Sequence, residues 1–464
     1  MPFPAHVFRE YDVRGVADRD LSDAFAHALG RAFAAILSTR RAEDAGRSGE
    51  RLTIAVGRDG RLSSPRLFEG LVRGLVAGGA HVVEIGVGPT PLLYFAAHHL
   101  ESDGAIQITG SHNPGEDNGF KMMRGKASFY GADIQELRRV MESELANVPG
   151  GEVTTRDVSD EYVGAVRAAS RLDPATTPKV VVDAGNGAAG PLGVRTLEAL
   201  GVKVDPLFCD IDGTFPNHHP DPTMPENLAD LEARVKETGA ALGIAWDGDG
   251  DRIGAMDEKG NVIWGDKLMI LFSRALLAEH PGATILGEVK CSETLFADVT
   301  KHGGRALYSK TGHSLIKSKM KAEGALLAGE MSGHMFFADR YFGYDDAIYA
   351  AVRLLEIVAR EGKPVSALLA DVPETHATPE LRFPCADEKK FAIVERVTAH
   401  YKRTHRVLDL DGARIDFGDG AWGLCRASNT QPVLVLRFEA RSPARRDEIR
   451  HQVEAFVEET ARSL

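Results

Sequence analysis

Short apolar segments alternate along the chain with segments whose apolar residues recur every three or four positions. The first kind predicts buried strands at 52–56, 180–183, 241–246 and 284–289. The second kind predicts amphipathic helices at 64–79 and 227–239, each closed by a glycine that suits a helix C-terminus. Such alternation predicts sheets with parallel strands and helices on their faces. Ligands of these folds bind beyond the carboxyl ends of the strands, where this chain has Gly- and Asp-rich turns.

The pattern changes after residue 370. Residues 412–440 read as strands joined by a loop, and residues 447–464 read as a helix, which together predict an α+β domain. A chain of 464 residues has room for three or four domains of about 150 residues. We predict four domains, with soft boundaries near 148, 252 and 370: residues 1–147, 148–252, 253–370 and 371–464.

Composition excludes several classes of protein. Hydrophobic residues make up 43% of the chain and charged residues 26%, which is typical of a folded globular protein. The longest apolar run, 268–272, is far shorter than a membrane span, and the first residues carry no secretory signal. The net charge of −12 argues against general binding to nucleic acid or to anionic membranes. Four scattered cysteines without a CxxC motif indicate neither a disulfide framework nor a thiolate zinc site. We therefore expect a cytoplasmic protein. No segment predicts a coiled coil, and we expect a monomer.

Three aspartates, Asp247, Asp249 and Asp251, directly follow the strand at 241–246 and are separated by single glycines. Alternate side chains of an extended segment point to the same side, so the three carboxylates can converge on one cation. Oxygen ligands alone favour a hard ion, Mg²⁺ or Ca²⁺. An EF-hand is excluded because Arg252 stands where that loop requires glycine. The alternative is a solvated acidic turn.

Ser111 lies in a second loop, TGSHNP at 109–114, which follows the apolar segment GAIQI. A serine among Gly, His, Asn and Pro is held in a tight, exposed turn, and the nearby Lys121 is suited to neutralise a developing anion. From the loop alone an ordinary turn is the favoured interpretation, because these residues dominate turns generally. If Ser111 faces the three aspartates, a bound Mg²⁺ would polarise a phosphoryl group on its oxygen.

Two further loops suit the binding of a phosphorylated ligand. Arg426, Ser428, Asn429 and Thr430 offer a guanidinium with several donors, as a phosphate requires. The loop GEMSGH at 329–334 places Glu330 beside hydroxyl and imidazole groups, which suits sugar hydroxyls. A polar hairpin and a structural Glu–His pair are the respective alternatives. The paired histidines at 218 and 219 look like metal ligands, but a structured loop is the better reading.

One motif suggests a different function. The segment GNGAAG at 185–190 follows a strand and precedes Asp205, as in a dinucleotide-binding fingerprint. It supplies an alternative reading as an NAD(P)-dependent oxidoreductase. Asp183 argues against this reading, because its charge would face the pyrophosphate.

Five motifs occur in one order: YDVRG, TGSHNP, DGDGDR, GEMSGH and RASNT. The chain thereby resembles the α-D-phosphohexomutase superfamily, and within it the bacterial phosphomannomutase/phosphoglucomutase group, from about residue 8 to about residue 445. The resemblance implies four domains around a central cleft: three related α/β domains with mixed sheets, carrying the serine, metal and sugar loops, and a smaller α+β domain that binds phosphate. It also implies that GNGAAG is an ordinary strand–helix turn.

The resemblance implies an activity: interconversion of hexose 1-phosphate and hexose 6-phosphate, with mannose or glucose as the sugar. Ser111 would carry the phosphoryl group and help Asp247, Asp249 and Asp251 to bind Mg²⁺. The intermediate would be a 1,6-bisphosphate, with glucose 1,6-bisphosphate as activator. Arg14 and Lys121 would assist transfer. Substrate-binding residues by the same resemblance are Tyr11, Arg252, Lys290, His313, Glu330, Met331, Ser332, Gly333, His334, Arg426, Ala427, Ser428, Asn429 and Thr430.

Substrate choice depends on few residues. Phosphoglucosamine mutases resemble this pattern but usually have Gln where this chain has Met331, so that activity is an alternative. A non-catalytic sensor of sugar phosphates on the same fold is another, although none of the five motifs is broken. Neither nucleic acid nor a membrane is an expected partner.

Overall fold

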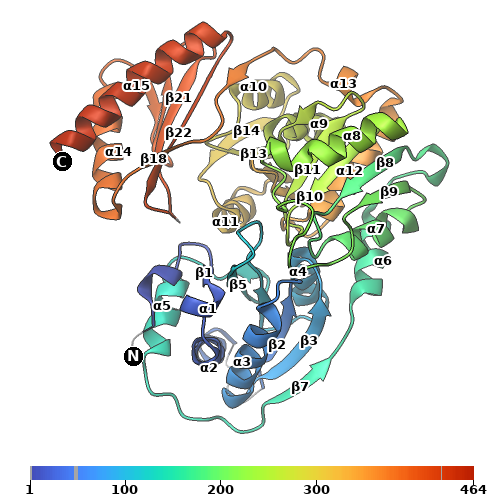
Figure 1. The fold of residues 1–464 in the computed structure, drawn as a ribbon, viewed down its shortest axis with the longest axis vertical. Helices are drawn as coiled ribbons and strands as arrows, with labels where there is room; N and C mark the ends of the chain where they lie inside the picture. The colour runs from blue at the N-terminus through green and yellow to red at the C-terminus, as the bar shows by residue number, and fades with distance from the viewer. Residues whose placement is uncertain (1–2, 46–50, 430) are drawn as a thin grey trace. The chain divides into compact units, whose positions relative to one another are not determined.

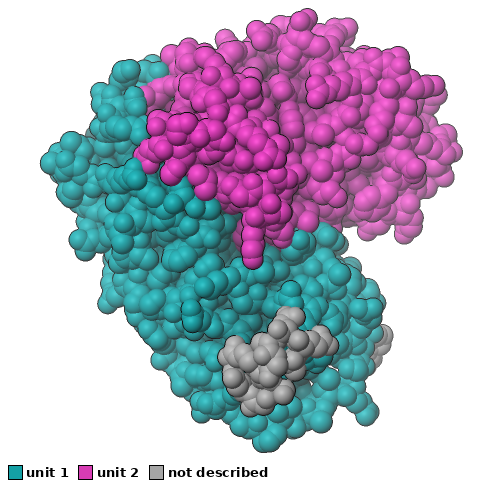
Figure 2. All heavy atoms as spheres, turned by 180° about the vertical axis from the view of Figure 1, so that it is seen from behind, with its two compact units in different colours: residues 1–268, 332–367 teal, residues 269–331, 368–464 magenta. Residues whose placement is uncertain are grey.

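We describe the protein from a computed structural model, which covers residues 3–45, 51–429 and 431–464. The chain forms two compact units (Figure 2). Unit 1 contains residues 1–268 and 332–367, and unit 2 contains residues 269–331 and 368–464. The chain passes from one unit to the other within helix α9 (Gly265–Glu279), between Met331 and Ser332, and within helix α13 (Val365–Leu368). The four predicted domains with boundaries near 148, 252 and 370 stay a prediction.

The first sheet of unit 1 is mixed, with strand order β1-β5-β4-β2-β3-β7 and β6 paired to β5. β2 pairs in parallel with β3 and β4, whereas β5 runs antiparallel to β4 and β1. Apolar residues of the first helices pack on this sheet, among them Phe33 and Leu71 against Ile54 (Figure 1). The elements are η1 (Ala5–Val7), β1 (Val13–Val16), α1 (Ala17–Asp20), α2 (Asp23–Ala45), β2 (Thr53–Arg58), α3 (Ser64–Ala77), β3 (His81–Val87), α4 (Thr90–His99), β4 (Gly104–Ile108), β5 (Asp117–Arg124), β6 (Ala127–Ser128), α5 (Ala132–Met141) and β7 (Glu152–Thr155).

The second sheet of unit 1 has the order β12-β11-β10-β8-β9. β10 pairs in parallel with β8 and antiparallel with β11, so the three-aspartate loop connects two adjacent antiparallel strands. The elements of this region are α6 (Ser159–Ala169), η2 (Pro174–Thr176), β8 (Lys179–Asp183), α7 (Gly190–Ala199), β9 (Lys203–Leu207), η3 (Pro225–Leu228), α8 (Ala229–Thr238), β10 (Leu242–Trp246), β11 (Ile253–Asp257) and β12 (Val262–Ile263). Unit 1 also contains β16 (Met335–Phe337), which is not part of this sheet, and α12 (Ala347–Glu361).

Unit 2 begins with a parallel arrangement in which β13 pairs with β14 and β15. Its last part is an antiparallel sheet of order β17-β22-β21-β20-β19, with β18 paired to β22. Helices α14 and α15 cover one face of this sheet, and Val397 and Val453 pack against Leu436 (Figure 1). The elements are β13 (Thr284–Glu288), α10 (Glu293–Lys301), β14 (Arg305–Ser309), α11 (His313–Glu323), β15 (Leu327–Gly329), β17 (His376–Ala377), β18 (Leu381–Pro384), α14 (Asp387–Tyr401), β19 (Arg406–Leu408), β20 (Ala413–Asp416), β21 (Trp422–Ala427), β22 (Val433–Ala440) and α15 (Pro443–Ser463).

The predicted strands and helices correspond to observed elements. The strands expected at 52–56, 180–183, 241–246 and 284–289 are β2, β8, β10 and β13, and the helices expected at 64–79 and 227–239 are α3 and α8. Gly239 ends α8 in the left-handed conformation, with φ of +61°. The α/β class with mixed sheets and a final α+β part is confirmed. Among the described residues, no helix has the length and hydropathy of a membrane span.

Candidate active site

Ser111 lies in the loop that joins β4 to β5 in unit 1. Its backbone has a φ of +51°, a conformation that non-glycine residues adopt rarely and that tends to mark functional sites. The side chain is 2% exposed, and its Oγ donates to Asp247 Oδ2 at 2.9 Å. The Nδ1 atom of His112 lies 3.1 Å from the same oxygen. The structure therefore brings the serine loop against the three-aspartate loop.

Arg61 contacts the backbone of the serine loop and is only 1% exposed. Its guanidinium donates to four backbone carbonyls of that loop: Ser111 at 2.7 Å, Asn113 at 2.6 Å, Pro114 at 2.5 Å and Asp117 at 2.9 Å. Asp59 completes the support, since it contacts Arg61 Nε at 3.2 Å and accepts from the Gly110 amide at 3.2 Å. A buried cation with several carbonyl acceptors fixes the path of this loop.

The carboxylates of Asp247, Asp249 and Asp251 converge as predicted. All three are fully buried, and one oxygen from each lies within 4.8 Å of the others. The solvated-turn alternative is therefore wrong. The intervening glycine at 248 is required by close approach, because a Cβ there would lie 2.3 Å from the Ser111 carbonyl.

This carboxylate group fits a hard divalent cation. Buried polar atoms normally have a partner, yet the Oδ1 atoms of Asp249 and Asp251 have no hydrogen-bond partner among the described residues. Burial, and then the charges of Asp249 and Asp251, raise the pKa of Asp247 well above its usual range. A cation bound to these oxygens would offset both effects, and oxygen ligands alone match Mg²⁺.

Lys121 reaches the aspartates from β5. Its Nζ donates to Asp249 Oδ2 at 2.7 Å and also to Asp251 Oδ2. Burial acts to lower the pKa of Lys121, but these two carboxylates outweigh it and the pKa is raised. Burial acts in turn to raise the pKa of Asp249, but Lys121 outweighs burial and the pKa is lowered. Thr90 Oγ1 adds a hydrogen bond to Asp249 Oδ2 at 2.5 Å. The charged ammonium of Lys121 therefore lies at the three-aspartate loop, which also accepts the hydrogen bond of the Ser111 hydroxyl.

Arg14 comes from β1, where it pairs with Gly119 of β5. Its guanidinium donates to Asp12 at 2.6 Å, to Asn113 Oδ1 at 3.0 Å and to the Gly110 carbonyl at 3.2 Å. Burial acts to lower the pKa of Arg14, but Asp12 and Asp249 raise it above its usual value. Tyr11, three residues earlier, is partly buried in the same segment. Arg14 therefore lies at the serine loop.

Arg252 and His334 also join this group in unit 1. Arg252 Nε donates to His334 Nε2 at 2.9 Å, and the two residues form an isolated antiparallel bridge. Gly333 allows that close approach, since its φ is +97° and a Cβ would lie 2.3 Å from the Ile253 carbonyl. Ser332 is partly buried beside it. The ends of β4, β10 and the 333–334 segment thus meet in one buried polar group.

Unit 2 holds a second group, organised by the buried Glu288. Glu288 Oε2 accepts from the Lys290 amide at 2.7 Å and from Thr311 Oγ1 at 3.1 Å, and Oε1 accepts from the Met331 amide at 3.3 Å. Burial raises the pKa of Glu288. One carboxylate therefore ties together three predicted loops. Glu330 adds a further tie, because its Oε1 accepts from the Gly312 amide at 3.1 Å.

The predicted cations of unit 2 are held by carboxylates. Lys290 Nζ donates to Glu380 at 2.6 Å, and Lys290 lowers the pKa of Glu380 to about 2. Arg426 Nε donates at 3.1 Å to Asp411 Oδ2, which also accepts from the Thr311 amide at 3.0 Å. His313 begins α11.

The predicted phosphate loop follows β21. Ala427 and Ser428 are buried and Asn429 is partly buried, whereas Thr430 lies outside the described residues. Lys390 donates to the Ser428 carbonyl at 2.6 Å. Ser428 Oγ accepts from the Gln431 amide at 3.2 Å. The loop is thus anchored from α14.

The two other sequence patterns have structural roles. Asp183 accepts from the Gly185 amide at 2.8 Å and contacts His218 Nε2 at 3.0 Å. The first turn of GNGAAG is thus engaged by a carboxylate, which argues against a pyrophosphate there. His219 Nε2 contacts the His112 carbonyl. The two histidines belong to a structured loop, as we expected.

Comparison with known families gives four matches in order along the chain. The models are phosphoglucomutase/phosphomannomutase alpha/beta/alpha domain I at residues 5–147, domain II at 160–260, domain III at 264–376 and the C-terminal domain at 380–456. The chain belongs to the phosphoglucomutase/phosphomannomutase family. The five motifs that suggested the resemblance all lie within the matched ranges.

Individual family members are similar over nearly the whole chain. A phosphomannomutase/phosphoglucomutase of Pseudomonas putida is 46% identical over 95% of this chain and 93% of its own. A phosphoglucomutase of Neisseria meningitidis is 43% identical over 97% of this chain and 96% of its own. A crystal structure of a phosphoglucomutase/phosphomannomutase family protein from Burkholderia thailandensis has a TM-score of 0.90 at 42% identity, covering 99% of this chain and 98% of its own.

Sequence reasoning missed several residues that organise the family's loops in this chain. They are all carboxylates or cations whose partners, backbone or side-chain, lie 11 or more positions away along the chain: Asp59, Arg61, Glu288, Asp345, Glu380, Lys390 and Asp411. Two had a signal in the sequence, because Asp59 and Arg61 lie in the turn after the strand predicted at 52–56. Glu288 also ends a predicted strand. The others stand in segments without a motif.

Proposed function

We propose that the protein is a phosphohexomutase that interconverts hexose 1-phosphates and hexose 6-phosphates of glucose, mannose or both. The contact of Ser111 with the three-aspartate loop is the main observation behind this proposal. The Ser111 hydroxyl donates to Asp247 at 2.9 Å, and Lys121 and Arg14 bring positive charge to the same loops. Membership of a family whose similar members are named phosphomannomutase/phosphoglucomutase supports it. The proposed site residues are those predicted from the sequence.

The proposed reaction is two phosphoryl transfers. In the first, a substrate hydroxyl attacks the phosphorus of phosphorylated Ser111, the bond from phosphorus to Ser111 Oγ breaks, and the hydroxyl proton ends on Ser111 Oγ, which leaves a 1,6-bisphosphate. The bisphosphate then reorients so that its other phosphoryl group faces Ser111. Ser111 Oγ attacks that phosphorus, the bond from phosphorus to the sugar oxygen breaks, the serine proton ends on that oxygen, and the second hexose monophosphate leaves. Glucose 1,6-bisphosphate would act as activator by phosphorylating a Ser111 that has lost its group.

The chain's own residues provide positioning and charge. Phosphoryl transfer depends mainly on in-line placement and on stabilisation of oxygen charge. Arg61 fixes the loop that carries Ser111, and Lys121 and Arg14 offset negative charge there. Asp247, Asp249 and Asp251 would hold Mg²⁺, which supplies Lewis-acid polarisation of the phosphoryl oxygens.

The other predicted substrate-binding residues have the chemistry for a sugar phosphate. In unit 2, Glu330 offers a partner to sugar hydroxyls, and Lys290, Arg426, Ser428 and Asn429 offer donors to a phosphate. In unit 1, Ser332 offers a further hydroxyl to a sugar. Solved family structures with bound N-acetylglucosamine 6-phosphate and magnesium, and with glucose 1,6-bisphosphate, belong to distant fungal relatives at 13–14% identity. They indicate the class of ligand that this fold binds.

Turnover of glucose 1-phosphate and mannose 1-phosphate tests the proposal, with Mg²⁺ and a trace of glucose 1,6-bisphosphate present. We expect turnover by the native chain, loss of at least about 10³-fold with Ser111→Ala, and native turnover with the control Ser143→Ala at an exposed serine. Equal turnover by Ser111→Ala and the native chain would refute the role of Ser111. A strong preference for glucosamine 1-phosphate would select the alternative mutase, and no turnover on any hexose phosphate would favour a sensor.

A further inference from the structure

Glu380 pairs with Lys290 in unit 2, and no motif of the sequence includes it. Lys290 Nζ donates to Glu380 Oε1 at 2.6 Å. Lys290 is 6% exposed, whereas the side chain of Glu380 is 26% exposed. A cation that we predict to bind the substrate's phosphate is therefore held by an anion of the chain itself.

The backbone holds Glu380 in place. It directly precedes β18, whose first residue, Leu381, pairs with Leu436 of β22. Two positions before Glu380, the Thr378 amide donates to the Phe438 carbonyl at 2.9 Å. Glu380 thus lies between two attachments to the same strand.

The turn that carries Lys290 is fixed as well. Arg414 donates to the carbonyls of Val289 at 2.6 Å and of Cys291 at 3.0 Å. The Lys290 amide donates to Glu288 Oε2 at 2.7 Å. The contact between Lys290 and Glu380 therefore joins two segments whose backbones are each held by other bonds.

Glu380 lies in a group of buried cations. Lys290, and to a smaller extent Arg437 and Arg426, lower the pKa of Glu380 to about 2. Each of the three cations is at most 6% exposed. The carboxylate is therefore ionised at neutral pH, and it lies where the positive charge of this group attracts an anion.

Arg426 also holds a carboxylate. Its Nε donates to Asp411 Oδ2 at 3.1 Å and its Nη2 to Asp411 Oδ1 at 3.4 Å. A guanidinium binds phosphate through the same fork of two bonds. Asp411 has a second partner, the Thr311 amide at 3.0 Å, so its replacement would also release a loop. Glu380 is therefore the clearer residue on which to test competition between a carboxylate and a phosphate.

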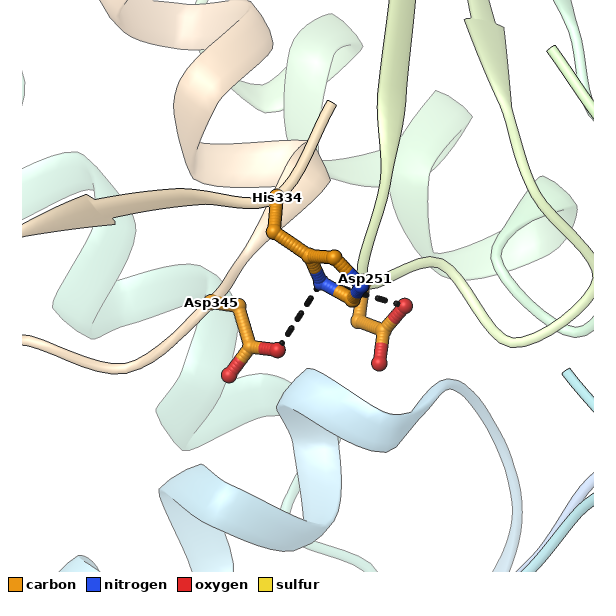
Figure 3. A group of neighbouring side chains, drawn as sticks. All are labelled: Asp251, His334 and Asp345. Carbon is orange, nitrogen blue, oxygen red and sulfur yellow. Dashed lines mark ion pairs between the residues drawn. The ribbon is translucent and has the colours of Figure 1, made fainter. Parts of the chain in front are cut away.

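Exposure distinguishes Glu380 from the buried carboxylates of unit 1. Asp345 Oδ2 lies 3.0 Å from His334 Nδ1, and Asp345 is 0% exposed (Figure 3). An anion from solvent does not reach that contact in the structure. The partly exposed Glu380 side chain can instead move into solvent when another anion takes its place at Lys290.

The proposed reaction requires such an exchange. Between the two transfers the 1,6-bisphosphate reorients, so the phosphate bound by Lys290 and Arg426 must leave them and the other phosphate must replace it. Very tight binding of either phosphate would stabilise a ground state and slow turnover. A carboxylate that pairs with Lys290 again as the phosphate leaves lowers the cost of this step.

We propose that Glu380 competes with the substrate's phosphate for Lys290 and thereby allows the two phosphates of the bisphosphate to exchange places. The inference rests on the proposed function for the identity of the anion and for its kinetic consequence. No covalent bond changes in this step, because Lys290 Nζ keeps its protons and exchanges a carboxylate acceptor for a phosphate acceptor.

The direct test is isothermal titration calorimetry with inorganic phosphate, in chelator, on the native chain and on Glu380→Gln. Glutamine keeps the size of the side chain and removes its charge. We expect the Kd of phosphate to be about tenfold lower in the variant, because a like charge beside the bound anion is gone. A Kd equal to the native value overturns the proposal, and a higher Kd does so too, since Glu380 would then assist binding.

Glu323→Gln is the matched control. Glu323 also pairs with a cation of unit 2, Arg305 at 2.7 Å, and its side chain is 33% exposed. We expect its phosphate Kd to stay within about twofold of the native value, because the exposed pair contributes little. Equal tightening in both variants would assign the effect to net charge and overturn a specific role for Glu380.

A double-mutant cycle with Lys290→Gln tests the competition itself. Without Lys290 there is no shared cation, so we expect Glu380→Gln to change the phosphate Kd by less than about threefold in that background. The full tenfold gain there would overturn competition for Lys290.

A structure of the native chain with bound glucose 1-phosphate tests the proposal even if a variant fails to fold. We expect Lys290 Nζ to contact the phosphate and to lie more than about 3.5 Å from the Glu380 carboxylate. A phosphate at Lys290 with the contact to Glu380 still intact overturns the proposal.

Kinetics test the exchange of phosphates. We expect both KM and kcat of Glu380→Gln to fall, kcat by about threefold or more, because a more tightly bound phosphate leaves more slowly. Tighter phosphate binding with a native kcat overturns the role in exchange. Absence of turnover in the native chain would instead refute the proposed function, and the phosphate titrations would still decide whether Glu380 competes for Lys290.

Discussion

Replacement of Arg61 by methionine tests whether the Arg61 guanidinium fixes the conformation of the serine loop. Methionine keeps much of the length of the side chain and removes the guanidinium. The change leaves four loop carbonyls without their donor, which accept from Arg61 at 2.5 to 2.9 Å in the native protein. It also removes the contact with Asp59 at 3.2 Å.

The structure sets the size of the effect. A hydrogen bond to a charged group contributes about 1.5–3 kcal/mol, and removing one partner of a buried ion pair costs about 3–5 kcal/mol. The bonds share one guanidinium and are not additive, so we expect Arg61→Met to lower the free energy of unfolding by about 3–5 kcal/mol. A displacement of Ser111 by about 1 Å would lower kcat by about 10²-fold.

Urea unfolding followed by tryptophan fluorescence measures the first quantity, and steady-state kinetics on glucose 1-phosphate measures the second. Arg51→Met is the matched control, because Arg51 is 44% exposed in its ion pair with Glu152 and should contribute less than about 1 kcal/mol. The reasoning would be refuted by an Arg61→Met protein whose free energy of unfolding lies within about 1 kcal/mol of the native value and whose kcat is native.

Three further predictions follow from the buried carboxylates. Glu288→Gln should raise KM for hexose phosphate by about tenfold and change kcat less, because one buried acceptor of the substrate loops loses its charge; steady-state kinetics measures both. Burial raises the pKa of Asp346 to about 6, above the unfolded value of about 4, so folding favours the protonated form. Stability should therefore fall by up to about 3 kcal/mol as pH rises from about 4 to about 6 and then level off, a slope that Asp346→Asn should remove in urea titrations at each pH. Chelation of divalent cations should abolish turnover and lower the Tm, and Mg²⁺ should restore both, because Asp247, Asp249 and Asp251 would repel one another unpaired.

Each of these has an outcome that contradicts it. For Glu288, equal KM values in the variant and the native chain mean that the three loops keep their positions without its charge. For Asp346, an unchanged pH slope in the Asn variant assigns the slope to other groups. For the aspartates, full turnover in chelator means that the site works without a metal.

The strands and the site loops could be predicted because both depend on neighbouring residues. Apolar runs ending in Gly and Asp gave the positions of β2, β8, β10 and β13, and the alternation of Asp and Gly at 247–251 indicated three carboxylates on one side. Chemistry alone left Ser111 undecided between a nucleophile and a turn residue. Its contact with Asp247, 136 positions away, is a tertiary contact that no local pattern encodes.

The supporting residues could not be predicted for the same reason. Arg61 contacts carbonyls about 50 positions away, and a lone arginine after a strand looks like an ordinary surface cation. Asp345 meets His334 only because a short bridge pairs Phe336 with Asp345. The order of strands in the mixed sheets likewise depends on long-range pairing, such as β5 between β1 and β4. These features follow from packing, which the sequence pattern does not specify.

Phosphoryl transfer to Ser111 tests the central claim most directly. The native chain and Ser111→Ala would be incubated with ³²P-labelled glucose 1,6-bisphosphate and Mg²⁺, and the labelled residue located by peptide mapping. We predict close to one label per native chain, all of it on Ser111, released on addition of unlabelled hexose monophosphate, and none on the variant. Turnover of hexose phosphate by a native chain that is labelled elsewhere, or not labelled at all, would contradict the account.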